Sequence, residues 1–204
     1  MYVSKTPAVV KALYSSLVWN MPRHTNNVYL TFDDGPHPQI TADVLTQLEQ
    51  YNAKASFFCI GNNILKFPEV FKQVAAKGHA IGNHTFNHVN GWKTANRDYY
   101  RNILKCQELM QTKLFRPPYG KITREQTRVV STRFDIIMWD VLAGDFDLRV
   151  NGEKCLDNVI KNIRPGSIVV FHDSEKAAEK MLYALPRVLE FIAEKKWNCA
   201  PLKY

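Results

Sequence analysis

The sequence contains no apolar run long enough to cross a bilayer. Near its start, AVVKALYSSLVW (8–19) is apolar, but Lys11 interrupts it and it is too short to span a membrane. No convincing small-x-small cleavage site follows it, so a removable signal segment is not indicated. We expect instead an amphipathic helix that packs against the rest of the chain. No stable membrane span is expected, and the localisation stays open between the cytoplasm and the cell envelope.

Cysteine is sparse, and its spacing excludes two kinds of site. The four cysteines lie far apart and form no C-x-x-C pair, so neither a zinc knuckle nor a dithiol redox motif is available. We expect buried free thiols. A disulfide stays open as the alternative, because the sequence does not give spatial proximity. The cysteines are Cys59, Cys106, Cys155 and Cys199.

The chain also lacks low-complexity tracts, internal repeats and a linker. Its 204 residues, of which 46% are hydrophobic, are enough to bury a full core in one domain. The formal net charge of +8 favours contact with anionic or neutral polymers. Because Lys and Arg are scattered rather than clustered, we expect no nucleic-acid partner. The oligomeric state is not indicated.

What the chain does have is an alternation of strand-like and helix-like segments. Short apolar segments typical of buried strands lie at 28–32, 55–60, 79–83, 114–117, 134–139 and 167–172. Helices are expected near 42–51, 68–77, 96–112 and 153–163, with one opening at a Thr123–Gln126 capping box and a last one capped by Ser174. This order predicts an α/β fold with parallel strands, either a closed or nearly closed β/α barrel or a doubly wound sheet.

In both folds the functional residues lie at the C-terminal ends of the strands. Polar residues of catalytic type follow or end most of the expected strands, where a purely structural chain would more often place glycine, asparagine or serine. These residues are Asp33, Asp34, His84, His88, Arg116, Tyr119, Asp140, Asp145 and His172. Their distribution indicates a site at this edge of the sheet.

The histidines of HTFNH (84–88) are spaced as metal ligands. At positions i and i+4 they fall on one face of a helical turn, so both can reach one metal ion. A carboxylate of the Asp33–Asp34 pair can complete the set, and the cation would offset the repulsion between the two acids. The alternative is that Asp33-Asp34-Gly35-Pro36 is simply an acidic turn.

Five motifs together carry a family resemblance. TFDDG (31–35), HTFNH (84–88), RPPYG (116–120), WDVLAGDFD (139–147) and VFH (170–172) resemble, in order and approximate spacing, those of the NodB-type polysaccharide deacetylases, carbohydrate esterase family four. The combination is far more specific than any single motif, and it covers about residues 26–200. The resemblance implies a distorted (β/α) barrel of the NodB type, with 26–204 as the catalytic domain and 1–25 as an N-terminal packing segment.

The resemblance also implies a metal centre and a base. Asp33 would be the general base, and Asp34 would bind one divalent transition metal together with His84 and His88. A His, His, Asp set suits zinc, which we expect, and equally cobalt or nickel.

Further roles are implied for the other motifs. Arg116 would hold Asp33 in place, and Asp145 would be the charged partner of His172, the general acid. The backbone N–H of Tyr119 would help to stabilise the oxyanion. Substrate-contacting positions would be Tyr119, Pro117 and Phe146.

The chain departs from the family pattern on the substrate side. Members usually have an acid at the position of Leu142 and tryptophan at that of Phe146, and Val170 replaces the usual leucine. Phe146 can still form an apolar wall, although it lacks an indole N–H. These departures bear on the substrate more than on the reaction.

The sequence therefore predicts a metal-dependent hydrolase that removes N-acetyl groups from N-acetylhexosamine residues of a glycan. Peptidoglycan, chitin-type oligomers and capsular glycans are not separated by these residues. The alternatives are O-deacetylation of xylan, hydrolysis of small amides on the same barrel, and a non-catalytic carbohydrate-binding protein. No G-x-S-x-G motif supports a serine nucleophile.

Overall fold

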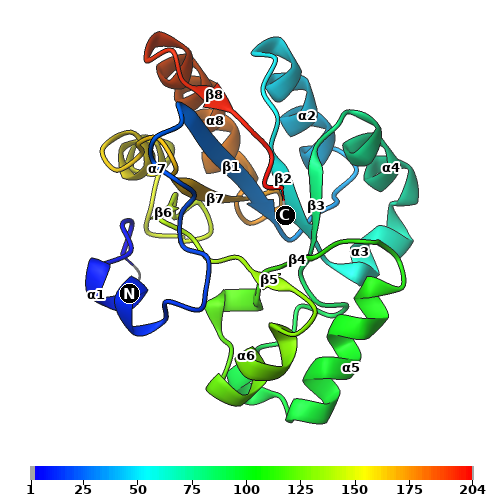
Figure 1. The fold of residues 1–204 in the computed structure, drawn as a ribbon. Helices are drawn as coiled ribbons and strands as arrows, with labels where there is room; N and C mark the ends of the chain where they lie inside the picture. Colours follow the sequence, from blue (N-terminus) through cyan, green and yellow to red (C-terminus); the bar gives the residue numbers. More distant parts are fainter. Residues whose placement is uncertain (1–2, 204) are drawn as a thin grey trace.

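The computed structural model describes residues 3–203. A curled parallel sheet forms its centre, and helices cover the outside (Figure 1). The strands are β1 (Asn27–Asp33), β2 (Ser56–Cys59), β3 (Ala80–Asn83), β4 (Leu114–Phe115), β5 (Asp135–Ile136), β6 (Val141–Leu142), β7 (Ile168–His172) and β8 (Asn198–Cys199). The helices are α1 (Ala8–Leu13), α2 (Ile40–Gln50), α3 (Gly61–Lys66), α4 (Pro68–Ala76), α5 (Asn96–Gln107), α6 (Arg124–Val130), α7 (Gly152–Ile160) and α8 (Ala178–Glu194).

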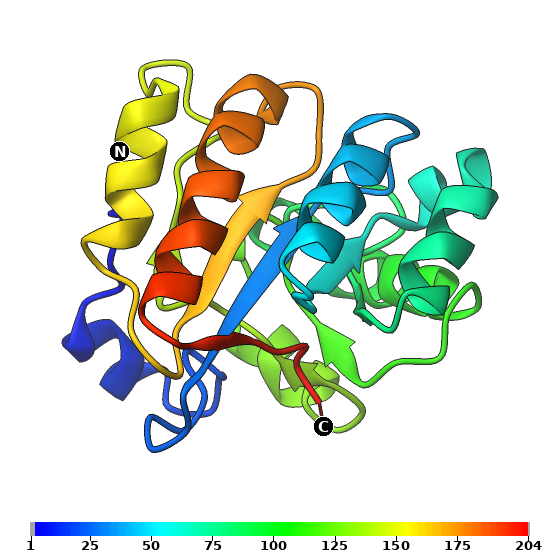
Figure 2. The same ribbon diagram turned by 90° about the horizontal axis from the view of Figure 1, so that it is seen from above.

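The strands follow the order β5-β4-β3-β2-β1-β7-β6, and β8 pairs with the start of β1. Every pairing along this path is parallel. Helices α7, α8, α2 and α4 lie in a row over one face of the sheet (Figure 2). Because β5 and β6 form the two edges of the curled sheet, the barrel is distorted rather than regularly closed. The predicted α/β class and distorted (β/α) barrel are confirmed.

The central strand β1 is buried because β2 and β7 pair with its two edges and packed side chains cover its two faces. Phe32 stacks between Phe57 and Phe171, with ring centroids 5.0 and 5.9 Å away. The near-continuous apolar sequence of β1 is typical of a strand buried on both faces. This packing fixes where β1 ends, and therefore where the acids that follow it lie.

Most of the expected elements form, with some differences in extent. Pro68 opens α4, and the Thr123–Gln126 capping box opens α6, as predicted. Ser174 does not cap α8, because residues 174–177 form a turn and Ala177 directly precedes the helix. The strands at 114–117 and 134–139 shorten to two residues each. The sequence did not reveal α3, β6 and β8.

The N-terminal segment packs through residues after α1 rather than through the helix itself. Helix α1 has only six residues and none is buried, so the helix expected from AVVKALYSSLVW (8–19) was too long. Leu17 and Trp19 are buried in a cluster with Phe134 and Met138, and Val18 forms a bridge to Ile137. A domain boundary near residue 25 stays a prediction.

The structure bears on the expected free thiols and on the expected lack of a membrane span. All four cysteines are free thiols, and three of them are buried. Within residues 3–203, no helix combines the length and the apolar character needed to cross a bilayer.

Candidate active site

A cleft of about 570 Å³ opens at the C-terminal ends of β1, β3, β4 and β7. Most of the predicted site residues line it, namely Asp33, Asp34, His84, His88, Pro117, Tyr119, Phe146 and His172. Arg116 and Asp145 lie behind this lining, where they contact Asp33 and His172. The parallel sheet therefore brings residues from five sequence motifs to one place.

Asp33 ends β1 and is held by a fully buried arginine. Nη1 of Arg116 donates to Oδ1 of Asp33 at 2.6 Å and to Oγ1 of Thr31 at 2.7 Å. The other guanidinium nitrogens donate to the carbonyl oxygens of Ile137 and Met138 at 3.1 Å each. With its donors occupied in this way, the guanidinium cannot rotate, and it fixes one oxygen of Asp33.

Asp34 lies beside the two histidines of HTFNH. Its Oδ1 is 3.1 Å from Nε2 of His88 and 3.7 Å from Nε2 of His84. One ligand atom from each of the three residues lies within 4.8 Å of the others. Within residues 3–203, Oδ1 of Asp34 is a buried acceptor that receives no hydrogen bond. Such a cluster fits a metal ion, since an anionic oxygen and two imidazole nitrogens converge on one point.

The histidines converge for a different reason from the one predicted. Residues 84–89 contain no helical turn, and the chain passes through left-handed conformations at Thr85, with φ 63°, and at His88, with φ 54°. The side chain of Asn83 accepts from the backbone N–H of Thr85, and Thr85 Oγ1 accepts from that of Val89. Local side-chain hydrogen bonds thus shape this loop, and the expected helical i, i+4 geometry was wrong.

Hydrogen bonds to other atoms orient the side chains that could bind a metal. Nδ1 of His84 lies 2.8 Å from the carbonyl oxygen of Arg116, so this nitrogen carries the proton and Nε2 is left as a lone-pair donor. Burial lowers the pKa of His84 to about 4, so its imidazole is neutral at pH 7. Burial raises the pKa of Asp34, but His88, His172 and His84 outweigh it and hold that pKa well below its ordinary value. Both groups therefore carry the protonation state that a metal requires.

His172 ends β7 and is paired with Asp145. Its Nδ1 lies 2.8 Å from Oδ1 of the buried Asp145, and its backbone N–H donates to Oδ2 at 2.7 Å. Burial lowers the pKa of His172, but the carboxylate of Asp145 outweighs it and raises the pKa to about 9. The Phe146 ring lies edge-on to the imidazole, with centroids 5.1 Å apart. His172 is thus a cation at neutral pH, with Nε2 free to donate a proton.

The walls of the cleft come from RPPYG and from the segment after β6. Tyr119 has φ 59° and is 61% exposed, and its ring lies 4.6 Å from that of His88. Leu142, where an acid was expected from the family pattern, is buried and contributes apolar surface. Trp139 and Lys121 also line the cleft and were not singled out from the sequence.

Sequence reasoning missed Asp173. This fully buried acid accepts from the backbone N–H of Gly35 at 2.9 Å and from Oγ1 of Thr41 at 2.5 Å. Burial raises its pKa to about 7. It therefore anchors the turn that carries Asp34. In the sequence, Asp173 could have been singled out because it is an acid directly after His172 at the end of an apolar strand.

Asp140 lies outside the cleft, although it was expected among the strand-end residues. It is fully buried and forms ion pairs with Lys5, Lys11 and Arg23. It precedes β6, so it lies at the N-terminal edge of the sheet, whereas Asp145 follows β6 and lies at the C-terminal edge. Its role is to fasten the N-terminal segment.

Comparison with known proteins identifies the family. A family model described as polysaccharide deacetylase matches residues 20–133. A peptidoglycan-N-acetylglucosamine deacetylase of Bacillus cereus is 40% identical over 161 residues, which make up 75% of this chain and 58% of that protein. The chain belongs to the polysaccharide deacetylase family.

Other members of the polysaccharide deacetylase family resemble the chain over more of their length. A chitooligosaccharide deacetylase of Azorhizobium caulinodans is 34% identical over 160 residues, 74% of this chain and 75% of that protein. The crystal structure of the Bc1960 peptidoglycan N-acetylglucosamine deacetylase superposes with a TM-score of 0.88 at 32% identity, covering 97% of this chain and 95% of that one. The NodB-type family and fold expected from the motifs are confirmed.

Proposed function

We propose that this protein is a metal-dependent deacetylase that hydrolyses the N-acetyl group of N-acetylglucosamine residues in a glycan of the peptidoglycan or chitin type. One observation carries the proposal. The Asp33–Arg116 pair, the Asp34–His84–His88 cluster and the Asp145–His172 pair lie at one cleft. A base, a metal-ligand set and an acid are the parts that amide hydrolysis needs.

Asp34, His84 and His88 would hold the metal. Their donor set suits zinc, cobalt and nickel, and the orphaned Oδ1 of Asp34 supports a cation at this point. When bound, a divalent cation would polarise the acetyl carbonyl and make water more acidic. The carbonyl of Arg116 fixes the tautomer of His84, so the metal set and the base are aligned by the same arginine.

Asp33 would act as the general base. The guanidinium of Arg116 holds one oxygen of Asp33 and leaves its second oxygen to take a proton from the attacking water. The substrate nitrogen must be protonated before the amine can leave. His172 would supply this proton from Nε2, since Asp145 keeps the ring protonated and oriented.

The remaining residues would bind the sugar and stabilise charge. The backbone N–H of Tyr119 would donate to the oxyanion as the carbonyl becomes tetrahedral. Pro117, Phe146 and Leu142 provide apolar surface for the acetyl methyl and for a sugar face. Because Leu142 adds no charge, a neutral N-acetylhexosamine fits this wall.

Acetate release tests the proposal directly. Metal-stripped protein is assayed on chitooligosaccharides and on peptidoglycan, before and after addition of zinc or cobalt. We expect metal to restore release, and Asp33→Asn to reduce it by about 10²- to 10⁴-fold, whereas Asp98→Asn on the exposed face of α5 leaves it unchanged.

The same assay separates the alternatives. Release from acetylated xylan but not from either aminoglycan would assign O-deacetylation. Turnover of small amides alone would assign a metabolite hydrolase. Glycan binding without release of acetate from any of these substrates, at full metal occupancy, would assign a binding protein.

A further inference from the structure

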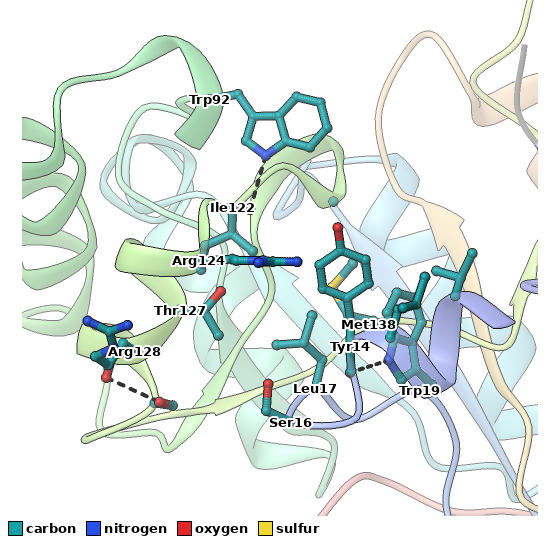
Figure 3. Close-up of a pocket in the computed structure, with 14 residues that line it drawn as sticks. Tyr14, Ser16, Leu17, Trp19, Trp92, Ile122, Arg124, Thr127, Arg128 and Met138 are labelled. Atoms are coloured by element: carbon teal, nitrogen blue, oxygen red, sulfur yellow. Dashed lines mark hydrogen bonds between the residues drawn. The ribbon is translucent and has the colours of Figure 1, made fainter. Parts of the chain in front are cut away.

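A second cavity, of about 510 Å³, lies between the N-terminal segment and α6 (Figure 3). Its floor is apolar and includes Leu17, Ile122 and Met138, and its rim carries Tyr14, Trp92 and Arg124. None of these residues belongs to the catalytic constellation described above. Most of the residues that line the cavity come from the N-terminal segment and from α6, to which the reaction assigns no role.

The cavity adjoins the active-site cleft at a single glycine. Gly120 lines both, with Met138 on the side of the second cavity and Trp139 on the side of the cleft. A Cβ at Gly120 would lie 2.6 Å from Trp139 and 3.3 Å from Met138, and its φ of +64° favours glycine. Trp139 and Met138 therefore pack directly against Gly120, and the two cavities adjoin at this residue.

The rim presents two exposed aromatic residues, Trp92 and Tyr14. Trp92 is 61% exposed, yet its Nε1 donates to the carbonyl oxygen of Ile122 at 3.0 Å, and Nζ of Lys121 lies 3.9 Å from its ring centroid. Tyr14 is 44% exposed, and its carbonyl oxygen accepts from Nε1 of Trp19. The Trp92 ring, exposed and held by these contacts, is poised for contact with a ligand rather than with the core.

The charge on this cavity has one sign. Arg124 and Arg128 line it, both are exposed, and no acidic residue is among its lining. In the part of the chain that the structure describes, neither arginine forms an ion pair. Figure 3 shows the Arg124 side chain reaching into the space between Trp92 and Tyr14. An unpaired guanidinium over an apolar floor suits a ligand that has a carboxylate and small alkyl groups.

We propose that this cavity is a subsite for a carboxylate-bearing peptide branch of the glycan whose N-acetylhexosamine occupies the cleft. The inference rests on the proposed function and deepens it, because it selects peptide-substituted glycan, as in peptidoglycan, over neutral chitin-type oligomers. Arg124 binds the carboxylate. The apolar floor receives alkyl side chains, and Trp92 covers the branch point. The excess positive charge of the chain favours the same anionic ligand.

Binding by the metal-stripped protein tests the subsite without turnover. Soluble peptidoglycan strands with intact peptides are compared with the same strands after an amidase has removed the peptides. We expect the peptide-bearing strands to bind about tenfold more tightly, and Arg124→Gln to abolish most of that difference. The preference should also weaken as salt rises, since it depends on exposed charge. Arg97→Gln, an equal loss of charge at an exposed position of α5 outside the cavity, should keep the preference.

The outcomes separate this inference from the proposed function. Equal affinity for both kinds of strand, or an equal loss for both on Arg124→Gln, overturns the subsite even if acetate is released. A preference that Arg124→Gln removes supports the subsite even if no acetate is released, in which case only the proposed reaction fails. Loss of the preference in Arg97→Gln as well would assign it to net charge and overturn the subsite.

Discussion

Nη1 of Arg116 lies 2.6 Å from Oδ1 of Asp33, and the two side chains are only 0% and 4% exposed. The pair is buried next to the centre of the sheet, and Thr31, Ile137 and Met138 complete the hydrogen bonds of the guanidinium. A buried charge of this kind is tolerated only because its partner is present. The pair therefore links the fold to the base of the proposed reaction.

Arg116→Met should destabilise the protein as well as inactivate it. The change leaves Asp33 buried without a counter-charge, so we expect the free energy of unfolding to fall by about 3–5 kcal/mol. Urea denaturation measures this loss. Arg128→Met, at an exposed position, should change the same quantity by less than about 0.5 kcal/mol. An equally small effect of Arg116→Met would mean that the buried pair does not stabilise the fold.

Metal binding should depend on the histidine cluster. Loss of a group that only orients a metal ligand lowers metal affinity by about 10- to 100-fold. His88 would itself be a ligand, so His88→Gln should weaken zinc binding by at least about 100-fold. Competition with a chromogenic chelator gives the affinity. His24→Gln, at an exposed histidine outside the cluster, is the matched control. Unchanged affinity in His88→Gln would place the metal elsewhere.

The basic limb of the activity profile should report the Asp145–His172 pair. A general acid works only while protonated, so kcat/KM should fall as the pH rises past the pKa of His172 at about 9. Asp145→Asn removes the carboxylate that raises this pKa, and the fall should move to lower pH. Asp147→Asn, two residues further on, should leave the profile in place. If the basic limb stays near pH 9 in Asp145→Asn, another group is the acid.

Gly35 should tolerate no side chain. A Cβ at this position would overlap the carboxylate of Asp173, which accepts from the backbone N–H of Gly35. Gly35→Ala should cost about 1–3 kcal/mol of stability and displace Asp34. Thermal unfolding and zinc affinity check the two effects. If the clash is the cause, Gly35→Ala combined with Asp173→Ala loses less stability than the sum of the single changes, whereas simple additivity would refute it.

Asp140 should stabilise the attachment of the N-terminal segment. It is buried and pairs with Lys5, Lys11 and Arg23. Asp140→Asn should therefore cost about 2 kcal/mol, and the cost stays at this level because the partly exposed cations regain water. Faster hydrogen exchange in residues 3–20 would locate the effect.

The wild-type protein and Asp140→Asn should also differ in how their stability changes at acid pH. Burial raises the pKa of Asp140, but Lys11, Lys5, Ser167 and Arg23 outweigh it and hold the pKa well below its ordinary value. This stabilisation is present above the ordinary aspartate pKa of about 3.9 and is lost as the pH falls below it. Asp140→Asn should therefore flatten the acid limb of the stability curve. An unchanged limb would show that other acids control it.

The sequence indicated the fold class because each strand is a short apolar run between helical patterns. It also indicated the site, because parallel strands bring their C-terminal ends to one edge. Asp33 at the end of β1 and His172 at the end of β7 lie in neighbouring strands and are in register. Their residue types and order were enough to identify the family.

The tertiary structure shows why Asp145, which the family motif indicated as the partner of His172, lies at the site whereas Asp140 does not. Asp140 and Asp145 lie five positions apart in the printed sequence and both follow an apolar segment, but the two-residue strand β6 separates them and sends them to opposite edges of the sheet. A strand this short carries no periodic signal.

Side-chain hydrogen bonds, rather than a helical period, likewise bring His84 and His88 together. The role of Asp173 also follows from contacts distant in the chain, with Gly35 and Thr41. The sequence by itself thus determined the class of fold, the family and the chemical types at the site. Packing between distant segments determined the geometry of the loops and the cavity beside Gly120, because such contacts leave no pattern in the local sequence.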